Sequence, residues 1–131
     1  MNYLLDTSVF LWALAAPERL NRQARHLLSS EKQDLVLSAA SSWEISIKHA
    51  LGRLQLPESP ATYIPIWIRR WGLRALEITH QHALAAGELP FHHQDPFDRV
   101  LIAQAQMEQL VLLTADRVFE RYPVEIVWCR R

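Results

Sequence analysis

Cysteine is nearly absent from this sequence, whose 131 residues include a single one, Cys129. One cysteine cannot form an internal disulfide, and no cysteine-rich metal-binding motif is present, so the class of disulfide-stapled secreted domains is excluded. This scarcity favours a reducing compartment, and we expect a cytoplasmic protein. Because half of the residues are hydrophobic, we predict one globular domain over residues 1–131 with a core of its own.

The sequence also lacks a long uninterrupted apolar run. The most apolar stretch extends from Leu4 to Ala16, with no lysine or arginine before it and with Asp6 inside it. A signal peptide would carry a basic segment at its start, and a bilayer-spanning helix would be longer. We therefore predict a buried strand leading into a helix, and no association with a membrane.

Lysine is scarce as well. Of the 14 basic residues only Lys32 and Lys48 are lysines, and the formal net charge is zero. Zero net charge gives no sign of a nucleic-acid partner, because phosphate binding usually shows as a basic patch. The arginines form local groups, at Arg19–Arg25 and Arg69–Arg74. Arginine matches phosphate geometry with parallel donors, but we interpret the first group as an ordinary solvated helix face.

Apolar runs of strand length alternate with segments of helical spacing along the whole chain. We predict strands at residues 1–5, 34–38, 73–78, 110–114 and 124–128. We predict helices at residues 7–16, 18–30, 39–52, 60–71, 79–87, 97–109 and 117–122, the fourth bent or divided at Pro65. Such alternation is typical of a three-layer α/β/α sandwich around about five mostly parallel strands.

Four acidic residues fall where one edge of that sheet gathers them. Asp6 and Asp116 follow apolar strands, while Glu44 and Asp98 lie in the first turns of helices. The carboxyl ends of parallel strands and the helix starts that follow them share one crevice. Converging carboxylates repel one another unless they are protonated or neutralised, and oxygen ligands of this kind suit Mg²⁺ or Mn²⁺. The pattern predicts a small metal-dependent nuclease.

Three of the four acids also have a purely structural interpretation. Glu44 precedes Lys48 by four residues, the favourable order for a surface ion pair on a helix. Asp98 follows a possible Asp95 cap, where an acid complements the helix dipole, and Asp116 is placed to cap the last helix. Asp6 has no such explanation. The joint arrangement, more than any single residue, favours the metal site.

Two other groups of residues invite functional interpretations. His92 and His93 suggest zinc, but no cysteine or suitably spaced histidine accompanies them, so we expect loop or surface roles. The five tryptophans are expected in the core, not as stacking platforms for nucleic acid: Trp12, Trp43, Trp67, Trp71 and Trp128. An alternative makes Trp67 and Trp71, with Ile64 and Ile68, a partner-binding patch.

Four segments together resemble the PIN-domain family, and within it the VapC-like toxins of bacterial toxin–antitoxin pairs. They are Leu-Leu-Asp6-Thr7-Ser8, Ser-Ser-Trp-Glu44-Ile, Asp95-Pro-Phe-Asp98-Arg-Val-Leu-Ile-Ala and Leu-Leu-Thr114-Ala-Asp116-Arg. Each segment alone is a weak pattern, whereas all four in this order and at these separations are specific. The resemblance covers nearly the whole chain.

This resemblance implies a strand order of 3-2-1-4-5 and a Mg²⁺- or Mn²⁺-dependent endoribonuclease. It further implies a homodimer, inhibited by a VapB-like antitoxin that covers the site. The residues matching the family's catalytic and metal-binding acids are Asp6, Glu44, Asp98 and Asp116. Those matching its supporting positions are Thr7, Ser8, Asp95 and Thr114, where Asp95 either assists or simply caps. Arg99 and Arg117 stand next to site acids, where they either contact RNA phosphate or pair with nearby glutamates.

Three rival interpretations remain. A phosphatase of the Asp-x-Asp type needs an acid at the position of Ser8, and a receiver-like protein needs a lysine after a late strand, which this chain lacks. Both are disfavoured. The third is a non-catalytic module that keeps the PIN fold and binds RNA or protein in its crevice, and the four intact acids argue against it.

Overall fold

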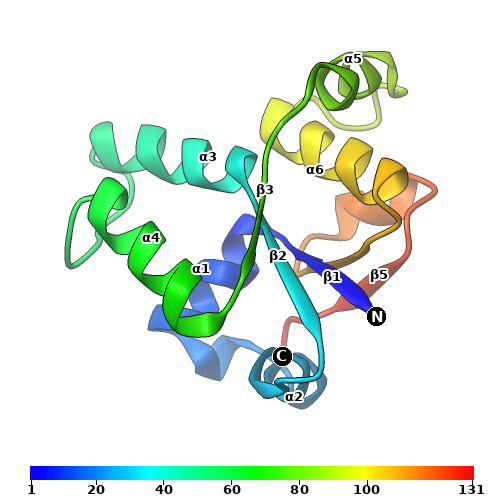
Figure 1. The fold of residues 1–131 in the computed structure, drawn as a ribbon. Helices are drawn as coiled ribbons and strands as arrows, with labels where there is room; N and C mark the ends of the chain where they lie inside the picture. Colours follow the sequence, from blue (N-terminus) through cyan, green and yellow to red (C-terminus); the bar gives the residue numbers. More distant parts are fainter.

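The computed structural model describes residues 1–131 and is built on a five-stranded, all-parallel sheet (Figure 1). The strands lie in the order β3-β2-β1-β4-β5, so β1 is central. Their bounds are β1 (Asn2–Leu5), β2 (Asp34–Ser38), β3 (Arg74–Leu76), β4 (Val111–Thr114) and β5 (Ile126–Trp128). Both the predicted sandwich and the strand order implied by the family resemblance are confirmed.

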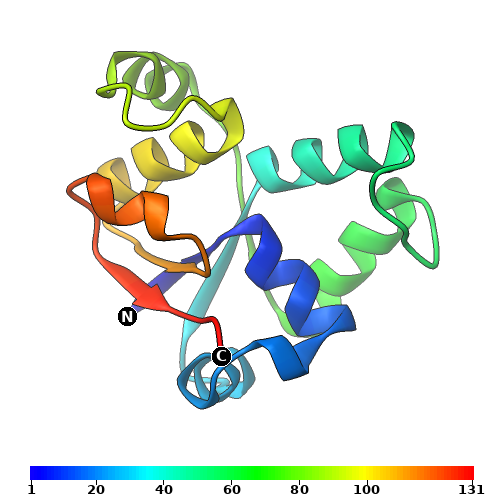
Figure 2. The same ribbon diagram turned by 180° about the vertical axis from the view of Figure 1, so that it is seen from behind.

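Helices cover both faces of this sheet (Figures 1 and 2). They are α1 (Thr7–Ala15), α2 (Arg22–Ser29), α3 (Ala39–Ala50), α4 (Pro60–Trp71), α5 (His80–Glu88) and α6 (Pro96–Met107), with short 3₁₀ helices η1 (Pro17–Arg19) and η2 (Arg117–Arg121). α3 begins directly after β2 ends and contacts both α4 and α6. No helix is both long enough and apolar enough to cross a membrane.

The core is divided by the sheet into two apolar layers. Tyr3 and Leu5 of β1 point into a layer shared with α1, α2 and α4, whereas Leu4 between them points into a layer shared with α6. This alternation follows from the two-residue period of a strand, and a parallel strand covered on both faces is apolar throughout. The uninterrupted apolar run of β1 is therefore required by its central position.

Side-chain caps set the helix starts that matter for the site. The Ser38 hydroxyl accepts a hydrogen bond from the Ala40 amide at 3.0 Å, and the Asp95 carboxylate accepts one from the Asp98 amide at 3.0 Å. Thr79 forms a reciprocal capping box with His82 at the start of α5. Such side chains satisfy amides that have no partner within the helix. They fix where α3 and α6 begin, and hence where Glu44 and Asp98 lie.

Two helix predictions are wrong in detail. Residues 18–30 do not form one helix, because the Asn21 side chain caps a separate α2 by accepting from the Ala24 amide and also donates to the Trp128 carbonyl. Leu20, predicted on that helix, is buried in the connection before it. Pro65 does not divide α4, which runs unbroken from residue 60 to 71.

The tryptophans also depart from expectation at one position. Trp12, Trp67 and Trp71 pack against the core as predicted. Ile64 is buried, which removes it from the alternative partner-binding patch of α4. Trp43 is 59% exposed and makes an edge-to-face contact with Phe97 across α3 and α6. It lies on the outer face of α3 because Glu44 and Ile45 take the inward positions of that helix.

Candidate active site

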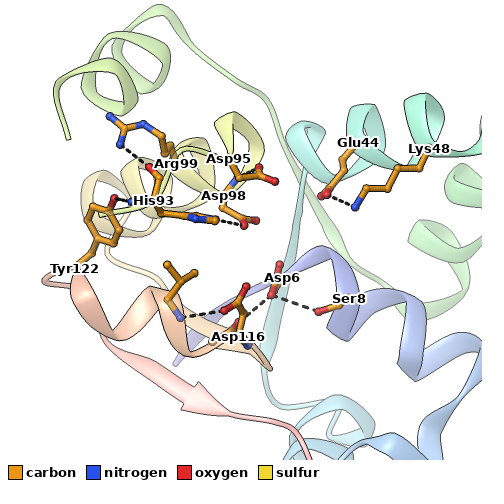
Figure 3. Close-up of polar contacts among 12 residues, drawn as sticks. Asp6, Ser8, Glu44, Lys48, His93, Asp95, Asp98, Arg99, Asp116 and Tyr122 are labelled. Carbon is orange, nitrogen blue, oxygen red and sulfur yellow. Dashed lines mark hydrogen bonds and ion pairs between the residues drawn. The ribbon is translucent and has the colours of Figure 1, made fainter. Parts of the chain in front are cut away.

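An open crevice of about 450 Å³ lies at the carboxyl ends of β1 and β4 (Figure 3). All four predicted acids line it, together with Asp95 and His93 on one side and Lys48 and Arg53 on the other. The predicted supporting residues Thr7 and Ser8 line it as well. The topology thus gathers side chains from β1, α3, α6 and the segment after β4.

Asp6 is the most constrained acid of the crevice. Asp6 is the N-cap residue of α1, although its carboxylate makes no capping hydrogen bond. The residue is only 5% exposed. The Thr114 hydroxyl donates to Asp6 Oδ2 at 2.8 Å, and the Ser8 hydroxyl reaches the same atom at 3.4 Å. The pKa of Asp6 is raised to about 6, mainly by burial and also by the charges of Glu44 and Asp116, while the hydrogen bond from Thr114 opposes the shift.

The hydroxyl of Thr7 has a different role from that of Thr114. It donates to Ser41 Oγ at 2.8 Å, and both side chains are buried. This bond ties the start of α1, directly after Asp6, to the first turn of α3, three residues before Glu44. The Thr7 hydroxyl therefore holds two walls of the crevice together, and only the Thr7 backbone contacts the carboxylate of Asp6.

Asp98 lies in the first turn of α6 and meets His93. His93 Nε2 is 2.8 Å from Asp98 Oδ2, and the His93 amide donates to the Tyr122 hydroxyl, which fixes the loop (Figure 3). Burial raises the pKa of Asp98 to about 7, with the charge of Asp6 adding to the shift and His93 opposing it. Asp98 thus faces the charge of Asp6, and Asp6 faces the charges of Glu44 and Asp116, so the crowded carboxylates repel one another.

His93 lies in a loop as expected, but its ring also contacts a site acid, which the sequence did not predict. The chain reverses at Asp95, where the helix cap forms, and this reversal lays the preceding loop over the first turn of α6. The sequence does give one sign of this role: His93 stands two residues before Asp95-Pro96, a helix start made of a capping aspartate and a proline. Ligand atoms of His93, Asp95 and Asp98 lie within 4.8 Å of one another, close enough to share a cation.

Glu44 combines the two interpretations offered for it. Its Oε2 forms the predicted pair with Lys48 Nζ at 2.7 Å, yet the residue is only 5% exposed, so this is no surface pair. Its other oxygen, Oε1, is buried without any hydrogen-bond partner. A buried carboxylate oxygen left unpaired is costly, and a cation or its water shell would satisfy it.

Asp116 also combines a structural and a site role. One oxygen, Oδ1, accepts from the Val118 amide at 3.0 Å and so caps η2, as the structural interpretation predicted. The Asp116 amide donates to Thr114 Oγ1 at 3.0 Å, which orients the hydroxyl that contacts Asp6. Asp95 behaves similarly, since Oδ1 caps α6 while the residue lines the crevice.

These donors fit a hard divalent cation. The crevice offers carboxylates from four elements, one histidine nitrogen and an unsatisfied carboxylate oxygen, and no thiolate. Mg²⁺ and Mn²⁺ prefer oxygen ligands and retain several waters, which an open crevice admits. The tightest grouping is that of His93, Asp95 and Asp98, with Asp6, Glu44 and Asp116 around it.

A phosphate contact by Arg99 is contradicted by the structure. Its guanidinium is buried and donates to the carbonyls of Ala86, Leu89, Pro90 and His93 at 2.8–3.1 Å. Consecutive helix residues point about 100° apart, so Asp98 faces the crevice while Arg99 faces away. Arg117 has the predicted alternative, an ion pair with Glu120, and its guanidinium covers the Trp128 ring at 3.8 Å.

Arg99→Lys is expected to destabilise the fold by about 2 kcal/mol. An ammonium lacks the planar fork that reaches four carbonyls, and buried carbonyls that lose their donors remain unsatisfied. Urea unfolding measures the change, with Arg121→Lys at an exposed position as the control. If the two variants are equally stable, the hydrogen bonds of Arg99 to these carbonyls do not stabilise the fold.

The sequence matches one family model over most of its length and one curated protein over about half of it. Residues 3–125 match the family model of the PIN domain. Over 60 residues the chain is 40% identical to ribonuclease VapC16 of Mycobacterium tuberculosis, an alignment covering 46% of this chain and 43% of that protein. The chain thus spans less than half the length of this curated relative.

Solved structures share the fold across almost the entire chain. VapBC2 from Rickettsia felis bound to a promoter DNA fragment aligns with a TM-score of 0.73 and 17% identity, covering 97% of this chain and 98% of that one. VapBC-1 from nontypeable Haemophilus influenzae aligns with a TM-score of 0.68 and 22% identity, covering 98% of both chains. At such identities the likeness concerns the fold.

Proposed function

We propose, from the premise that this chain belongs to the PIN-domain family, that it is a metal-dependent endoribonuclease and the toxin of a toxin–antitoxin pair. The observation that carries the proposal is the convergence of Asp6, Glu44, Asp98 and Asp116 on one crevice, with Glu44 Oε1 unsatisfied. The partial likeness to a protein named as a VapC ribonuclease supports the reaction class. On this proposal residues 1–131 act as one PIN-like domain.

The proposed cofactor is Mg²⁺ or Mn²⁺. Asp6, Asp98 and Asp116 would hold the ion directly or through water, and Glu44 would complete the shell. A bound ion of this kind polarises a phosphoryl oxygen and lowers the pKa of a coordinated water, which suits hydrolysis of a phosphodiester. The products of the proposed reaction are a 5′-phosphate and a 3′-hydroxyl.

The chain's own side chains orient these groups. Thr114 and Ser8 fix one oxygen of Asp6, so its other oxygen faces the crevice. His93 fixes Asp98 in the same way. Lys48 holds Glu44 Oε2, which leaves Oε1 to orient the attacking water. Hydrogen bonds of this kind around a metal site set ligand geometry before the ion arrives.

The proposed partners are RNA, a VapB-like antitoxin and a second copy of the chain, in the cytoplasm. A solved structure of the same fold, from Klebsiella pneumoniae, is described as a toxin–antitoxin complex, which supports an antitoxin partner. An open acidic crevice is suited to occlusion by a basic side chain of such a protein. The alternative is a non-catalytic PIN-fold module that binds RNA or protein.

Cleavage of a mixed RNA pool by the purified protein tests the proposal. We expect cutting in Mn²⁺ or Mg²⁺ that EDTA abolishes, and products that carry 5′-phosphates. If metal binds but no RNA in the pool is cut, the binding-module alternative is favoured. Cutting that persists in EDTA would contradict the metal mechanism.

A further inference from the structure

Two cations line the otherwise acidic crevice, and neither has a role in the mechanism above beyond the contact of Lys48 with Glu44. They are Lys48 and Arg53, on the side of the crevice formed by the end of α3. The structure therefore divides the crevice into a carboxylate side and a basic rim.

Lys48 has donors to spare. Its Nζ is 2.7 Å from Glu44 Oε2, and its side chain is half exposed. An ammonium carries three N–H donors, and Glu44 occupies one. The other two are available to an acceptor in the crevice.

Arg53 is brought beside Lys48 by the turn that ends α3. Gly52 adopts φ +72°, the Gly52 amide donates to the His49 carbonyl at 3.1 Å, and the Arg53 amide donates to the Lys48 carbonyl at 2.9 Å. This is the glycine-dependent helix ending in which the chain doubles back over its last turn. The exposed Arg53 side chain makes no hydrogen bond or ion pair within the chain, so its five donors are free.

We propose that Lys48 and Arg53 form a phosphate-binding rim that positions the RNA strand next to the metal-binding acids. The inference rests on the proposed function and names the residues by which that site takes its substrate. A crevice of five carboxylates in a chain of zero net charge repels RNA unless cations stand at the point of entry. Lys48 and Arg53 are the only lysine and arginine side chains that line it.

Binding of a fluorescent single-stranded RNA, measured by anisotropy in Mg²⁺ and in EDTA, tests this rim. The Asp98→Asn protein serves as the uncut background, into which Lys48→Gln and Arg53→Gln are introduced. We expect each to weaken binding about fivefold at low salt, and each to reduce the slope of log affinity against log salt by about 0.7, the value for one phosphate contact on a single strand.

Arg22→Gln is the matched control, because it removes the same charge from an exposed position of α2, at the opposite end of the molecule from α3 and α6 (Figures 1 and 2). It is expected to change RNA affinity less than twofold. Equal loss in Arg22→Gln and Arg53→Gln would mean that only net charge matters, and it would overturn the inference.

A merely structural role of Lys48 gives a different result. If Lys48 only holds Glu44, then Lys48→Gln changes Mn²⁺ affinity, measured by calorimetry in the otherwise natural chain, and leaves RNA affinity and its salt slope unaltered. That outcome would overturn the inference for Lys48. Restored RNA binding in Lys48→Arg, which keeps the charge, supports it.

The inference and the proposed function fail in distinguishable ways. If the natural chain cuts RNA while the Lys48 and Arg53 variants bind as tightly as their background, the rim is wrong and the nuclease stands. If the natural chain binds RNA through Lys48 and Arg53 but never cuts it, the rim stands and the nuclease is wrong. Absence of both binding and cutting overturns both.

Discussion

Asp98→Asn is expected to lower the rate of metal-dependent RNA cleavage at least about 100-fold. The amide keeps the shape of the side chain and its packing at the start of α6, but it loses the charge that faces Asp6 and contacts His93. Changes to groups that only support metal ligands already cost about 10- to 100-fold, and a group offered directly to the ion should cost no less. Initial rates on a defined RNA across a Mn²⁺ series measure the effect.

Asp34→Asn is the matched control for this experiment. Asp34 undergoes the same chemical change, but it lies at the start of β2, away from the crevice, in an exposed ion pair with Arg74 at 3.1 Å. Its variant should cut RNA at the natural rate. If Asp98→Asn retains more than about a tenth of the activity at saturating Mn²⁺, the proposed mechanism assigns the wrong acid to the metal.

Much of the architecture could be predicted because it depends on short-range rules. Three local patterns of the sequence are found in the structure: the apolar run of β1, the caps at Ser38 and Asp95, and the alternation of strands with helices. The strand order is not local, and it came from the family resemblance. With that order in place, the convergence of acids follows, because parallel strands end at one edge.

The errors arise where orientation depends on tertiary contacts. Arg99 adjoins Asp98 in sequence, but one step along a helix turns its side chain toward the carbonyls around Leu89. His93 lies in a loop as expected, but the sequence alone does not show that this loop brings the ring of His93 to Asp98. Trp43 departs from the expectation of core tryptophans because its neighbour Glu44 takes the inward position.

A second large effect concerns stability in the absence of metal. We expect the metal-free protein to lose several kcal/mol of unfolding free energy as the pH rises from about 4 to about 7. Burial raises the pKa of Asp6 to about 6 and that of Asp98 to about 7, whereas in the unfolded chain both return to their ordinary value of 3.8. Each unit of pKa difference corresponds to about 1.4 kcal/mol, so Asp6 alone contributes about 3 kcal/mol.

The direction follows from proton binding. Between pH 4 and 7 the folded chain keeps protons on Asp6 and Asp98 that the unfolded chain has released, so the folded state binds more protons and its stability falls as pH rises. Urea unfolding in EDTA at several pH values measures this slope. The double variant Asp6→Asn, Asp98→Asn should flatten it, while Asp34→Asn should leave it unchanged. At pH 7.5 in EDTA, Asp98→Asn alone should match or exceed the stability of the natural chain.

A divalent cation should reverse the effect, since it supplies at high pH the neutralisation that protons supply at low pH. Added Mn²⁺ should therefore stabilise the natural chain strongly at pH 7.5 and little at pH 4.5, where it competes with protons for the same carboxylates. The double variant should show no metal-dependent stabilisation at either pH. Stabilisation by Mn²⁺ that is equal at both pH values would mean that the ion binds elsewhere. In that case the repulsion between the carboxylates at the end of β1 would be unrelated to metal binding.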